Sequence, residues 1–260
     1  MKLKIDFHVH SQKSFDCDMT ISQIIDIAKE KGLDGICICD HANTDIQDSL
    51  SNDNVNFIII PAVEFTTGKN HIISMFLEKE PDIVFGKNFM VPVEKIAEET
   101  EKCGGICILA HPFERLAEGI DTVSQRTDNI MPLMDGMEIY NARAPYKYSS
   151  ANRLAQEKAY HSGITVLTSG SDAHIPSEIG NAYCIVDTPS RSLEDIKKAV
   201  LDGKVEFVPN RHAKRTCIVK SEFIKARKFK RSVFYKAKLI LKYPLFFTLD
   251  MYDKIIGRKL

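Results

Sequence analysis

The sequence predicts an α/β fold, and three features of the 260-residue chain lead to this prediction. Short apolar runs alternate with longer segments in which apolar residues recur every three or four positions, as in amphipathic helices. Glycines separate many of these segments, where turns are expected. Histidine and carboxylate side chains recur beside the ends of the apolar runs. Alternation of strands and helices favours a mostly parallel sheet, either open or closed into a barrel.

The expected elements follow one another along the first 210 residues. Strands are predicted at residues 2–9, 35–39, 57–63, 71–77, 106–110, 136–140, 164–168 and 205–208. Helices are predicted at residues 20–31, 93–102, 149–161 and 193–201. The first helix illustrates the reasoning: Thr20 can cap it, Ile24 and Ala28 lie on its apolar face, and Gly32 ends it. This number of strands is too large for a small sheet and suits an open sheet or a barrel.

The charged residues are distributed unevenly, although the totals balance at 35 basic and 35 acidic residues. Residues 1–210 contain 20 Lys and Arg against 32 Asp and Glu, whereas residues 211–260 contain 15 against 3. The sequence therefore predicts an acidic body, residues 1–210, and a basic, partly amphipathic C-terminal extension, residues 211–260. Apolar residues make up 44% of the chain, as in ordinary globular proteins.

Composition argues against a membrane-spanning or secreted protein. No segment approaches the roughly 18 uncharged apolar residues that a spanning helix needs. The N-terminus becomes charged at Lys2, too early for a signal peptide. The seven cysteines are odd in number and scattered, and Cys37 and Cys39 alternate on one predicted strand. We interpret them as buried thiols in the reducing cytoplasm rather than as a redox pair or a metal clip.

Potential metal ligands recur at one topological position, the end of a predicted strand. In barrels of alternating strands and helices, this end carries the catalytic groups. Imidazole nitrogens and carboxylate oxygens together bind divalent ions such as zinc, manganese or iron. An unpaired buried charge costs several kcal/mol, so a buried group of this kind calls for a cation. The candidates are Asp6, His8, His10, Asp40, His41, Glu64, His71, His111, Glu138, Asp172 and His174.

Each candidate also has a purely structural interpretation. His8 and His10 can form a hydrogen-bonded pair in the core, and Glu64 can cap a helix or lie at the surface. His71 alone is typical of a half-buried structural histidine. The proline that follows His111 is expected to hold it in an extended conformation. Taken together, however, the set predicts a site for two or three divalent metal ions.

The order of these motifs resembles the PHP (polymerase and histidinol phosphatase) superfamily. The motif residues are Asp6-Phe7-His8-Val9-His10, Asp40-His41, Glu64, His71, His111-Pro112 and Ser171-Asp172-Ala173-His174. The resemblance extends from about residue 3 to residue 209. It implies a distorted (β/α)7 TIM-like barrel with a two- or three-metal site at the C-terminal ends of its strands. It also implies the activity of a metal-dependent phosphoesterase.

The resemblance further implies how the ligands are shared among the ions. The ligands of the first ion would be His8, His10, Glu64 and Asp172. Glu64 would bridge to a second ion, held also by His71 and His111. The ligands of the third ion would be Asp16, His41 and His174. Some members of the superfamily carry histidine at the position of Asp16, and the neighbouring Asp18 is an alternative ligand.

A cluster of this composition favours hydrolysis of a phosphate ester of a small metabolite or nucleotide. A hydroxide that bridges two ions about 3.5–4 Å apart is a nucleophile at neutral pH. The same ions neutralise charge as it develops on the phosphoryl oxygens. Asp6, Glu138 and His174 are the candidates for proton transfer to the leaving alkoxide. We expect a small phosphorylated substrate as the partner of this site.

Basic residues near the predicted strand ends are candidates for phosphate binding. Arg143 follows the segment that contains Glu138, where a guanidinium can reach phosphate in a bidentate manner. Arg115 is a second candidate, whereas Lys13 and Lys69 carry less weight. A surface arginine without a substrate role is the competing interpretation. The sequence has no Gly-rich phosphate loop of the common types and no Gly-x-Ser-x-Gly motif, which disfavours a covalent serine nucleophile.

Two other functions remain open at this level. The first is a metallohydrolase that cleaves a non-phosphate bond such as an amide, because two-metal sites also catalyse that reaction. The second is a metal-binding regulatory module attached through the basic extension. For residues 211–260 three interpretations compete: a helix docked on the acidic body, an anchor on an anionic membrane surface, and a nucleic-acid contact. The sequence does not predict the oligomeric state.

Overall fold

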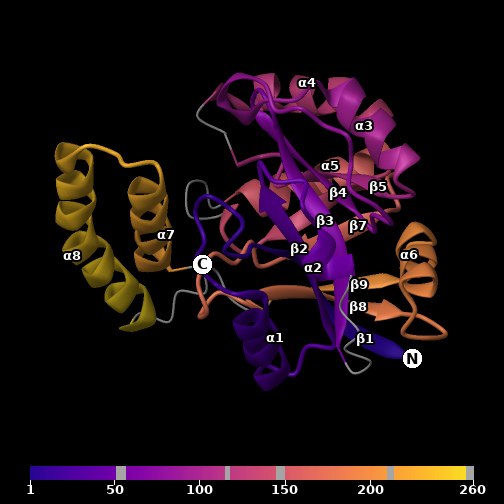
Figure 1. Cartoon of the computed structure of the whole chain (residues 1–260), viewed down its shortest axis with the longest axis horizontal. Helices are drawn as coiled ribbons and strands as arrows, with labels where there is room; N and C mark the ends of the chain where they lie inside the picture. Colours follow the sequence, from indigo (N-terminus) through magenta and orange to yellow (C-terminus); the bar gives the residue numbers. More distant parts are fainter. Residues whose placement is uncertain (51–56, 115–117, 145–149, 210–213, 256–260) are drawn as a thin grey trace.

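The computed structural model describes residues 1–50, 57–114, 118–144, 150–209 and 214–255. Within these residues, nine strands form a single sheet that curves into a nearly closed barrel (Figure 1). The predicted α/β barrel is thus confirmed. The order of strands across the sheet is β7-β6-β5-β4-β3-β2-β1-β8-β9. In chain order the strands are β1 (Lys2–Val9), β2 (Gly35–His41), β3 (Ile58–Thr67), β4 (Asn70–Met75), β5 (Ile106–Ala110), β6 (Gly136–Asn141), β7 (Leu167–Gly170), β8 (Ala182–Asp187) and β9 (Val205–Pro209).

The sheet is mixed rather than mostly parallel, so that part of the sequence prediction is wrong. Strands β1, β2 and β3 are parallel neighbours, as are β5, β6 and β7. Strand β4 runs antiparallel to both β3 and β5, because a two-residue turn after Thr67 reverses the chain at once. Gly68 in this turn has a φ of 61°, which favours glycine. Strands β8 and β9 add an antiparallel pair beside β1.

Helices cover the outside of the sheet (Figure 1). They are α1 (Ile21–Glu30), α2 (Gln47–Leu50), α3 (Val93–Lys102), α4 (Ile120–Ile130), α5 (Ala151–Ser162) and α6 (Leu193–Leu201), with short 3₁₀ turns η1 (Lys87–Phe89) and η3 (Met131–Leu133). Thr20 caps α1: its side chain accepts a hydrogen bond from the N–H of Gln23, whose side chain accepts one from the N–H of Thr20. Helix α4 and strand β8 were not predicted from the sequence. On α4 the polar residue Thr127 lies on the buried face, which interrupts the apolar pattern of an amphipathic helix.

The barrel closes where the chain after β7 meets β1. The backbone N–H of His10 donates to the carbonyl of Ala173 at 3.0 Å, and that of Ala173 donates to the carbonyl of His8 at 3.3 Å. Gly170 lies so close to β1 that a Cβ atom there would sit 2.3 Å from the Cβ of His8. No side chain fits in that space, so glycine at this position allows the two strands to approach.

A register shift in β1 changes which of its side chains face the barrel interior. The odd-numbered apolar residues as far as Phe7 pack in the interior cluster. The pairing of β1 with β2 shifts between Asp6 and Val9, and Val9 packs on the outside with residues of α1. Beyond the shift, the even-numbered His8 and His10 face inward at the rim, where both approach the same carboxylate of β3.

The C-terminal residues form a helical hairpin on one side of the barrel (Figure 1). Helix α7 (Arg215–Lys228) lies nearer the barrel, and helix α8 (Val233–Ile255) packs on it. Val219 and Ala226 of α7 form a small apolar core with Leu239 of α8. Among the described helices, none combines the length and the apolar character that crossing a membrane requires. The predicted boundary between residues 210 and 211 lies outside the described residues.

Candidate metal centre

Glu64, in the second half of β3, lies at the centre of a group of imidazole rings at one rim of the barrel. Its Oε1 atom is 2.8 Å from Nδ1 of His71 and 3.1 Å from Nε2 of His111. Its Oε2 atom is 3.2 Å from Nε2 of His8 and 3.3 Å from Nε2 of His10. Each oxygen of this carboxylate therefore faces a separate group of nitrogens.

Two further carboxylates complete the cluster. The Oδ1 atom of Asp172 lies 3.3 Å from Nε2 of His10. Asp16 lies beside two other rings, with Oδ1 3.4 Å from Nε2 of His174 and Oδ2 3.9 Å from Nε2 of His41. The structure thus brings together the nine residues that the family resemblance implies as ligands. Of the other candidates, Asp40 accepts hydrogen bonds from Ser11 instead.

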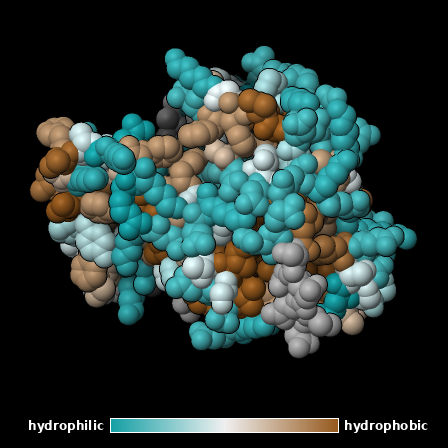
Figure 2. All heavy atoms as spheres, viewed as in Figure 1, coloured by the Kyte–Doolittle hydropathy of each residue, from teal (hydrophilic) through white to brown (hydrophobic). Residues whose placement is uncertain are grey.

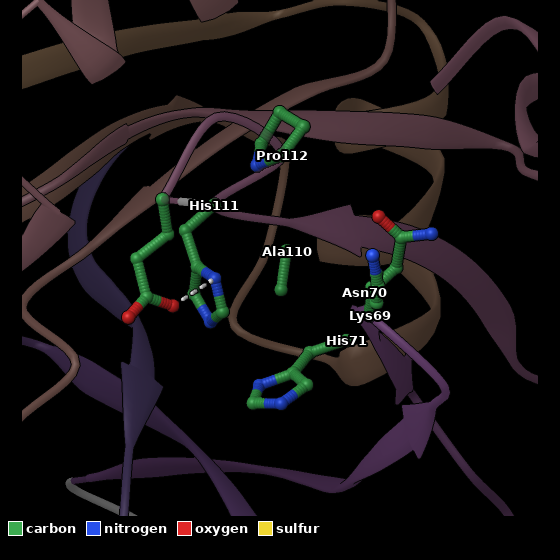
Figure 3. Close-up of a pocket in the computed structure, with 7 residues that line it drawn as sticks. Lys69, Asn70, His71, Ala110, His111 and Pro112 are labelled. Carbon is green, nitrogen blue, oxygen red and sulfur yellow. Dashed lines mark ion pairs between the residues drawn. The ribbon is translucent and has the colours of Figure 1, made fainter. Parts of the chain in front are cut away.

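His71 reaches the rim from the start of a strand rather than from its end. Strand β4 runs antiparallel to β3, and His71 pairs with Thr66 across that hairpin. The first residues of β4 therefore lie at the rim where the parallel strands have their C-terminal ends. Figure 3, a view of a small pocket beside the cluster, shows the rings of His71 and His111 directed into the same space.

Several buried imidazole nitrogens have no hydrogen-bond partner in the described part of the chain. They are Nδ1 and Nε2 of His10 and Nδ1 of His41. Two ligand atoms bound to one ion at about 2.1 Å in tetrahedral geometry lie roughly 3.4 Å apart. The nitrogen–oxygen distances in the cluster, from 2.8 to 3.9 Å, surround that value. Unpartnered nitrogens at such distances from carboxylates fit a shared divalent cation.

Among the described residues, four triads of side chains place their ligand atoms within 4.8 Å of one another. They are His8–Glu64–His111, His41–Glu64–His71, His10–His41–His174 and His8–His10–Cys39. Glu64, His8, His10 and His41 each belong to two triads, and of these four only Glu64 has the two oxygens that can bridge two ions. Cys39 was interpreted from the sequence only as a buried thiol; its alternation with His41 along β2 is the signal that could have found it. Burial raises the pKa of Cys39 well above its usual range, which makes it a poorer ligand than the imidazoles.

Burial and neighbouring charges set the protonation states of the cluster. Burial, reinforced by the rings of His174 and His41, lowers the pKa of His10 to about 3. His10 is therefore neutral at neutral pH and presents a lone pair to a cation. Burial alone would raise the pKa of Glu64, but the imidazoles, that of His41 first, hold it well below its usual range. Glu64 is thus ionised, as a ligating carboxylate must be.

Glu138 supports the cluster from behind and does not line the cavity described below. Its Oε1 atom lies 3.1 Å from Nδ1 of His8. Its Oε2 atom accepts hydrogen bonds from the backbone N–H of His111 at 2.9 Å and from Nδ2 of Asn141 at 3.1 Å. A carboxylate on the second nitrogen of a ligating histidine fixes the tautomer and orientation of the ring. These contacts make Glu138 a positioning residue and give no support to its predicted role in proton transfer.

Asp6 is also buried, and its carboxylate is occupied by backbone donors. Its Oδ1 atom accepts from the N–H groups of Ser171 at 2.8 Å and His8 at 3.3 Å, and Oδ2 accepts from that of Gly180 at 2.9 Å. Burial raises the pKa of Asp6 to about 6, although these hydrogen bonds oppose the shift. The side chain thus ties β1 to the loop that carries Asp172, and its contacts do not support the predicted role in proton transfer.

Two of the ligands have strained backbones. The φ angles of 26° at His111 and 54° at Asp172 lie in a region that residues other than glycine rarely adopt. The prediction that His111 is extended is therefore wrong. Its N–H donates to Glu138. Its ring lies between Glu64 and Glu114, and Oε2 of Glu114 is 3.1 Å from Nδ1 of His111. Strain of this kind persists where surrounding contacts over-determine the conformation, and it clusters at functional sites.

The candidate ligands other than His8 and His10 line a cavity of about 330 Å³ that has helix α7 as its opposite wall. From the barrel it is lined by Phe15, Asp16, His41, Glu64, Thr66, His71, His111, Glu114, Arg143, Ala144, Asp172 and His174. From α7 it is lined by Ile218, Ser221, Glu222 and Lys225. The sequence did not identify these α7 residues as site residues, because only the docking of α7 on the rim brings them near the ligands.

Arg143 connects the barrel to α7 at the edge of this cavity. Its guanidinium donates to Oγ of Ser221 at 2.6 Å, and its Nε is 3.6 Å from Oε1 of Glu178. Burial disfavours the charged form, but the carboxylates of Glu178 and Asp172 raise the pKa of Arg143, which therefore stays charged. The predicted phosphate-binding arginine thus lies where an anion in the cavity can meet it.

Helix α7 also holds the loop that carries Asp16. The Nζ atom of Lys228 donates to three carbonyl oxygens of this loop, those of Gln12, Ser14 and Cys17, at 2.9, 2.7 and 2.6 Å. One ammonium group thus fixes the backbone on both sides of Asp16. The interpretation of the extension as a helix docked on the acidic body agrees with this contact.

The remaining predicted residues pair with other side chains or lie outside the described residues. Asp18 forms an ion pair with Arg227 of α7, so that Asp16 and not Asp18 faces the imidazoles. Lys13 and Lys69 pair with nearby carboxylates. Arg115 lies outside the described residues.

Comparison with known proteins bears on the family. A PHP-associated family model matches residues 149–205. An uncharacterized protein of Methanocaldococcus jannaschii is 27% identical over 154 residues, which cover 54% of this chain and 82% of that protein. A two-domain protein of Bacteroides vulgatus that contains a predicted PHP-like metal-dependent phosphoesterase has a similar structure. It is 20% identical with a TM-score of 0.60, over 87% of this chain and 70% of that one.

A lesion-specific endonuclease of Pyrococcus furiosus is also similar in structure. It is 19% identical with a TM-score of 0.55, over 82% of this chain and 61% of that one. The solved structures at these identities show a shared fold. With the match to the PHP-associated model, they confirm the resemblance to the PHP superfamily and the PHP type of barrel.

Proposed function

We propose that this protein is a metal-dependent phosphoesterase that hydrolyses a phosphate ester of a small metabolite or nucleotide. The observation that carries the proposal is the position of Glu64, whose two oxygens face separate groups of imidazoles in the wall of a cavity. Likeness in fold to a protein that contains a predicted phosphoesterase, and to an endonuclease, supports it. Both descriptions concern cleavage of phosphate esters.

The donor set fits two or three divalent cations such as zinc, manganese or iron. Their proposed ligands are His8, His10, Glu64 and Asp172 for the first, Glu64, His71 and His111 for the second, and Asp16, His41 and His174 for the third. Bound there, the ions would supply activated water and neutralise charge on a transferring phosphoryl group. The protein keeps the ligands in place through carboxylates behind them, such as Glu138 on His8.

Two basic side chains around the cavity, one from the barrel and one from α7, suit a phosphorylated substrate. Arg143 holds a charged guanidinium at the cavity. The amino group of Lys225 also lines it, 4.7 Å from the centre of the Phe15 ring. These two cations can bind anionic groups of a substrate whose ester faces the ligands. A cavity of about 330 Å³ is of the size that binds small molecules.

Of the three residues predicted for proton transfer, His174 alone lines the cavity. Its Nδ1 donates to the carbonyl of Asp172 at 2.8 Å, which leaves Nε2 directed toward Asp16. The same nitrogen is thus available either to a third ion or to a proton for the leaving alkoxide. We assign both roles to Nε2 of His174. When a third ion is bound, this nitrogen acts as a ligand, and when no third ion is bound, it can carry the proton.

Metal analysis of the purified protein, together with a phosphate-release assay, tests the proposal. The panel contains phosphorylated metabolites, nucleotides and short oligonucleotides, with zinc, manganese or iron added. We expect two or more bound ions and phosphate-ester cleavage, both of which decrease in His8→Ala. His161→Ala is the matched control, because His161 is exposed on α5. Amide cleavage alone, or fewer than two ions without any esterase activity, would refute the proposal.

A further inference from the structure

Helix α8 presents an apolar face that no described residue covers. Its exposed side chains include Phe234, Leu241 and Leu245, and Leu241 is 77% exposed. Single exposed apolar residues are normal on soluble proteins, but here they follow one helix over most of its length. Figure 2 shows apolar side chains gathered at the end of the molecule that α8 occupies.

Both sides of α8 are apolar, but only one is packed. The inner side contacts α7 through Leu239 and its neighbours. The outer stripe begins at Phe234 and continues through Leu241, Leu245 and Tyr252, which are exposed and recur at helical spacing. The outer stripe is therefore not needed to hold the hairpin together.

The charges around this stripe are basic. Lys238 and Lys242 are exposed on α8 beside the stripe, and Lys230 and Arg231 precede the helix. Among the described side chains of α8, the carboxylate is that of Asp250, which is turned inward and accepts hydrogen bonds from the backbone at the start of α7. Among the described side chains, the outer face thus combines apolar groups with positive charge.

We propose that the outer face of α8 binds the surface of an anionic membrane, with the helix parallel to the bilayer plane. The apolar stripe enters the boundary of the acyl chains, and the flanking lysines meet the anionic headgroups. The aromatic rings of Phe234 and Tyr252, near the two ends of the stripe, suit the interfacial layer. A helix that lies in the interface need not be long enough to span the membrane.

This face suits a lipid surface better than the other partners of a basic helix. On a nucleic acid, phosphates would pair with the lysines, but the apolar stripe would contact a polar backbone. In a pair of identical helices, Lys238 and Lys242 of both chains would approach like charges. The acidic residues 1–210 are repelled by an anionic membrane, which leaves the basic hairpin as the part that approaches it.

Co-sedimentation of the full chain with vesicles tests this proposal without any measurement of activity. We expect the wild type to sediment with vesicles of phosphatidylglycerol and phosphatidylcholine, and much less with phosphatidylcholine alone. Leu241→Glu, which places a carboxylate in the middle of the stripe, should weaken binding about tenfold. Tyr160→Glu on α5, at a residue that is 84% exposed, is the matched control and should bind as the wild type does.

The salt dependence and the oligomeric state complete the test. Added salt should weaken vesicle binding without abolishing it, because apolar contacts persist when charges are screened. Equal binding of Leu241→Glu and the wild type would overturn the proposal. So would a dimer that Leu241→Glu dissociates while neither protein binds vesicles, or binding to RNA but not to vesicles. Circular dichroism and the metal content of Leu241→Glu confirm that it is folded.

Discussion

The ligand cluster and the α7–α8 hairpin differ in how they are held. The ligands come from strands and rim loops of the barrel, and buried groups fix them from behind, as Glu138 fixes His8. The hairpin is attached to the rim largely through polar side chains, among them Lys228 and the Ser221 hydroxyl that meets Arg143. The cavity therefore has one wall set by the barrel itself and another that can change without loss of the barrel. Chemistry is expected to depend on the first wall, and substrate choice and location on the second.

Replacement of the central carboxylate should break the cluster most completely. Glu64→Gln keeps the side-chain volume but removes the charge that the surrounding imidazoles face. We expect esterase activity to fall about 10³-fold or more, because metal ions contribute several kcal/mol of charge stabilisation. Mass spectrometry of bound metal should show fewer ions than in the wild type. Glu157→Gln on α5 is the control, and an unchanged metal content in Glu64→Gln would exclude it as a ligand.

We expect a smaller loss of activity when Glu138 is replaced, because Glu138 acts on the metal site through the ligand His8 and not directly. Glu138→Gln removes the negative charge behind His8. It also replaces one of the two carboxylate oxygens by an NH₂ group, which cannot accept the hydrogen bonds that His111 and Asn141 donate to Glu138. We expect metal affinity to fall roughly 10–100-fold. Activity should recover when metal is added in excess, as titration of the apoprotein with manganese would show. Loss of activity that metal cannot restore would instead favour direct proton transfer by Glu138.

Cys17 lies next to Asp16 in the loop that α7 contacts, and its thiol should make the stability of the protein depend on pH. Burial raises the pKa of its thiol from 9.0 to about 12. Between these values the folded protein keeps a proton that the unfolded chain loses, so stability falls as pH rises through this window. Cys17→Ser can keep the hydrogen bond to the carbonyl of His10 without this titration. Its free energy of unfolding should decline less steeply, by up to about 1.4 kcal/mol per pH unit.

Denaturant unfolding of both proteins between pH 8 and pH 10.5 measures this difference. Equal slopes in the two proteins would mean that the thiol titrates in the folded state as it does in the unfolded chain.

The smallest effect is expected where the hairpin holds the barrel loop. Lys228→Met keeps the aliphatic part of the side chain but removes three bonds to carbonyl oxygens around Asp16. We expect the affinity of the third ion to fall less than tenfold, below the value of one charged hydrogen bond, because Lys228 acts on the ion only through the position of the loop. The other ions should be unaffected. Isothermal titration with metal resolves the sites, and Lys220→Met, exposed on α7, is the control. A uniform loss at all sites would indicate a general destabilisation.

The meeting of most candidate ligands at one rim could be predicted because each lies beside a recognisable strand end. The parallel strands bring these ends to one rim, so His41, His111 and Asp172 meet although they are far apart in sequence. His71 does not follow this rule, and only the β3–β4 hairpin explains its position. The backbone strain at His111 was not predictable, because it depends on Glu138 and other partners from distant strands.

The α7 wall could not be predicted from local patterns. Composition indicates that the extension is basic, but not which of its faces meets the barrel. The bond between Arg143 and Ser221 joins residues 78 positions apart, and that between Lys228 and Ser14 joins residues 214 positions apart. Closure of the barrel at Gly170 could not be predicted from local patterns either. It depends on the close approach of Gly170 to His8, which is distant in the sequence.

The contact of Lys228 with the carbonyl of Gln12 links residues 216 positions apart and has a consequence for biosynthesis. A chain leaves the ribosome N-terminus first, and its early parts begin to fold before the late parts exist. The loop around Asp16 is therefore made well before Lys228, the residue that fastens it. We therefore expect the third group of candidate ligands to reach its final arrangement only after α7 has been made.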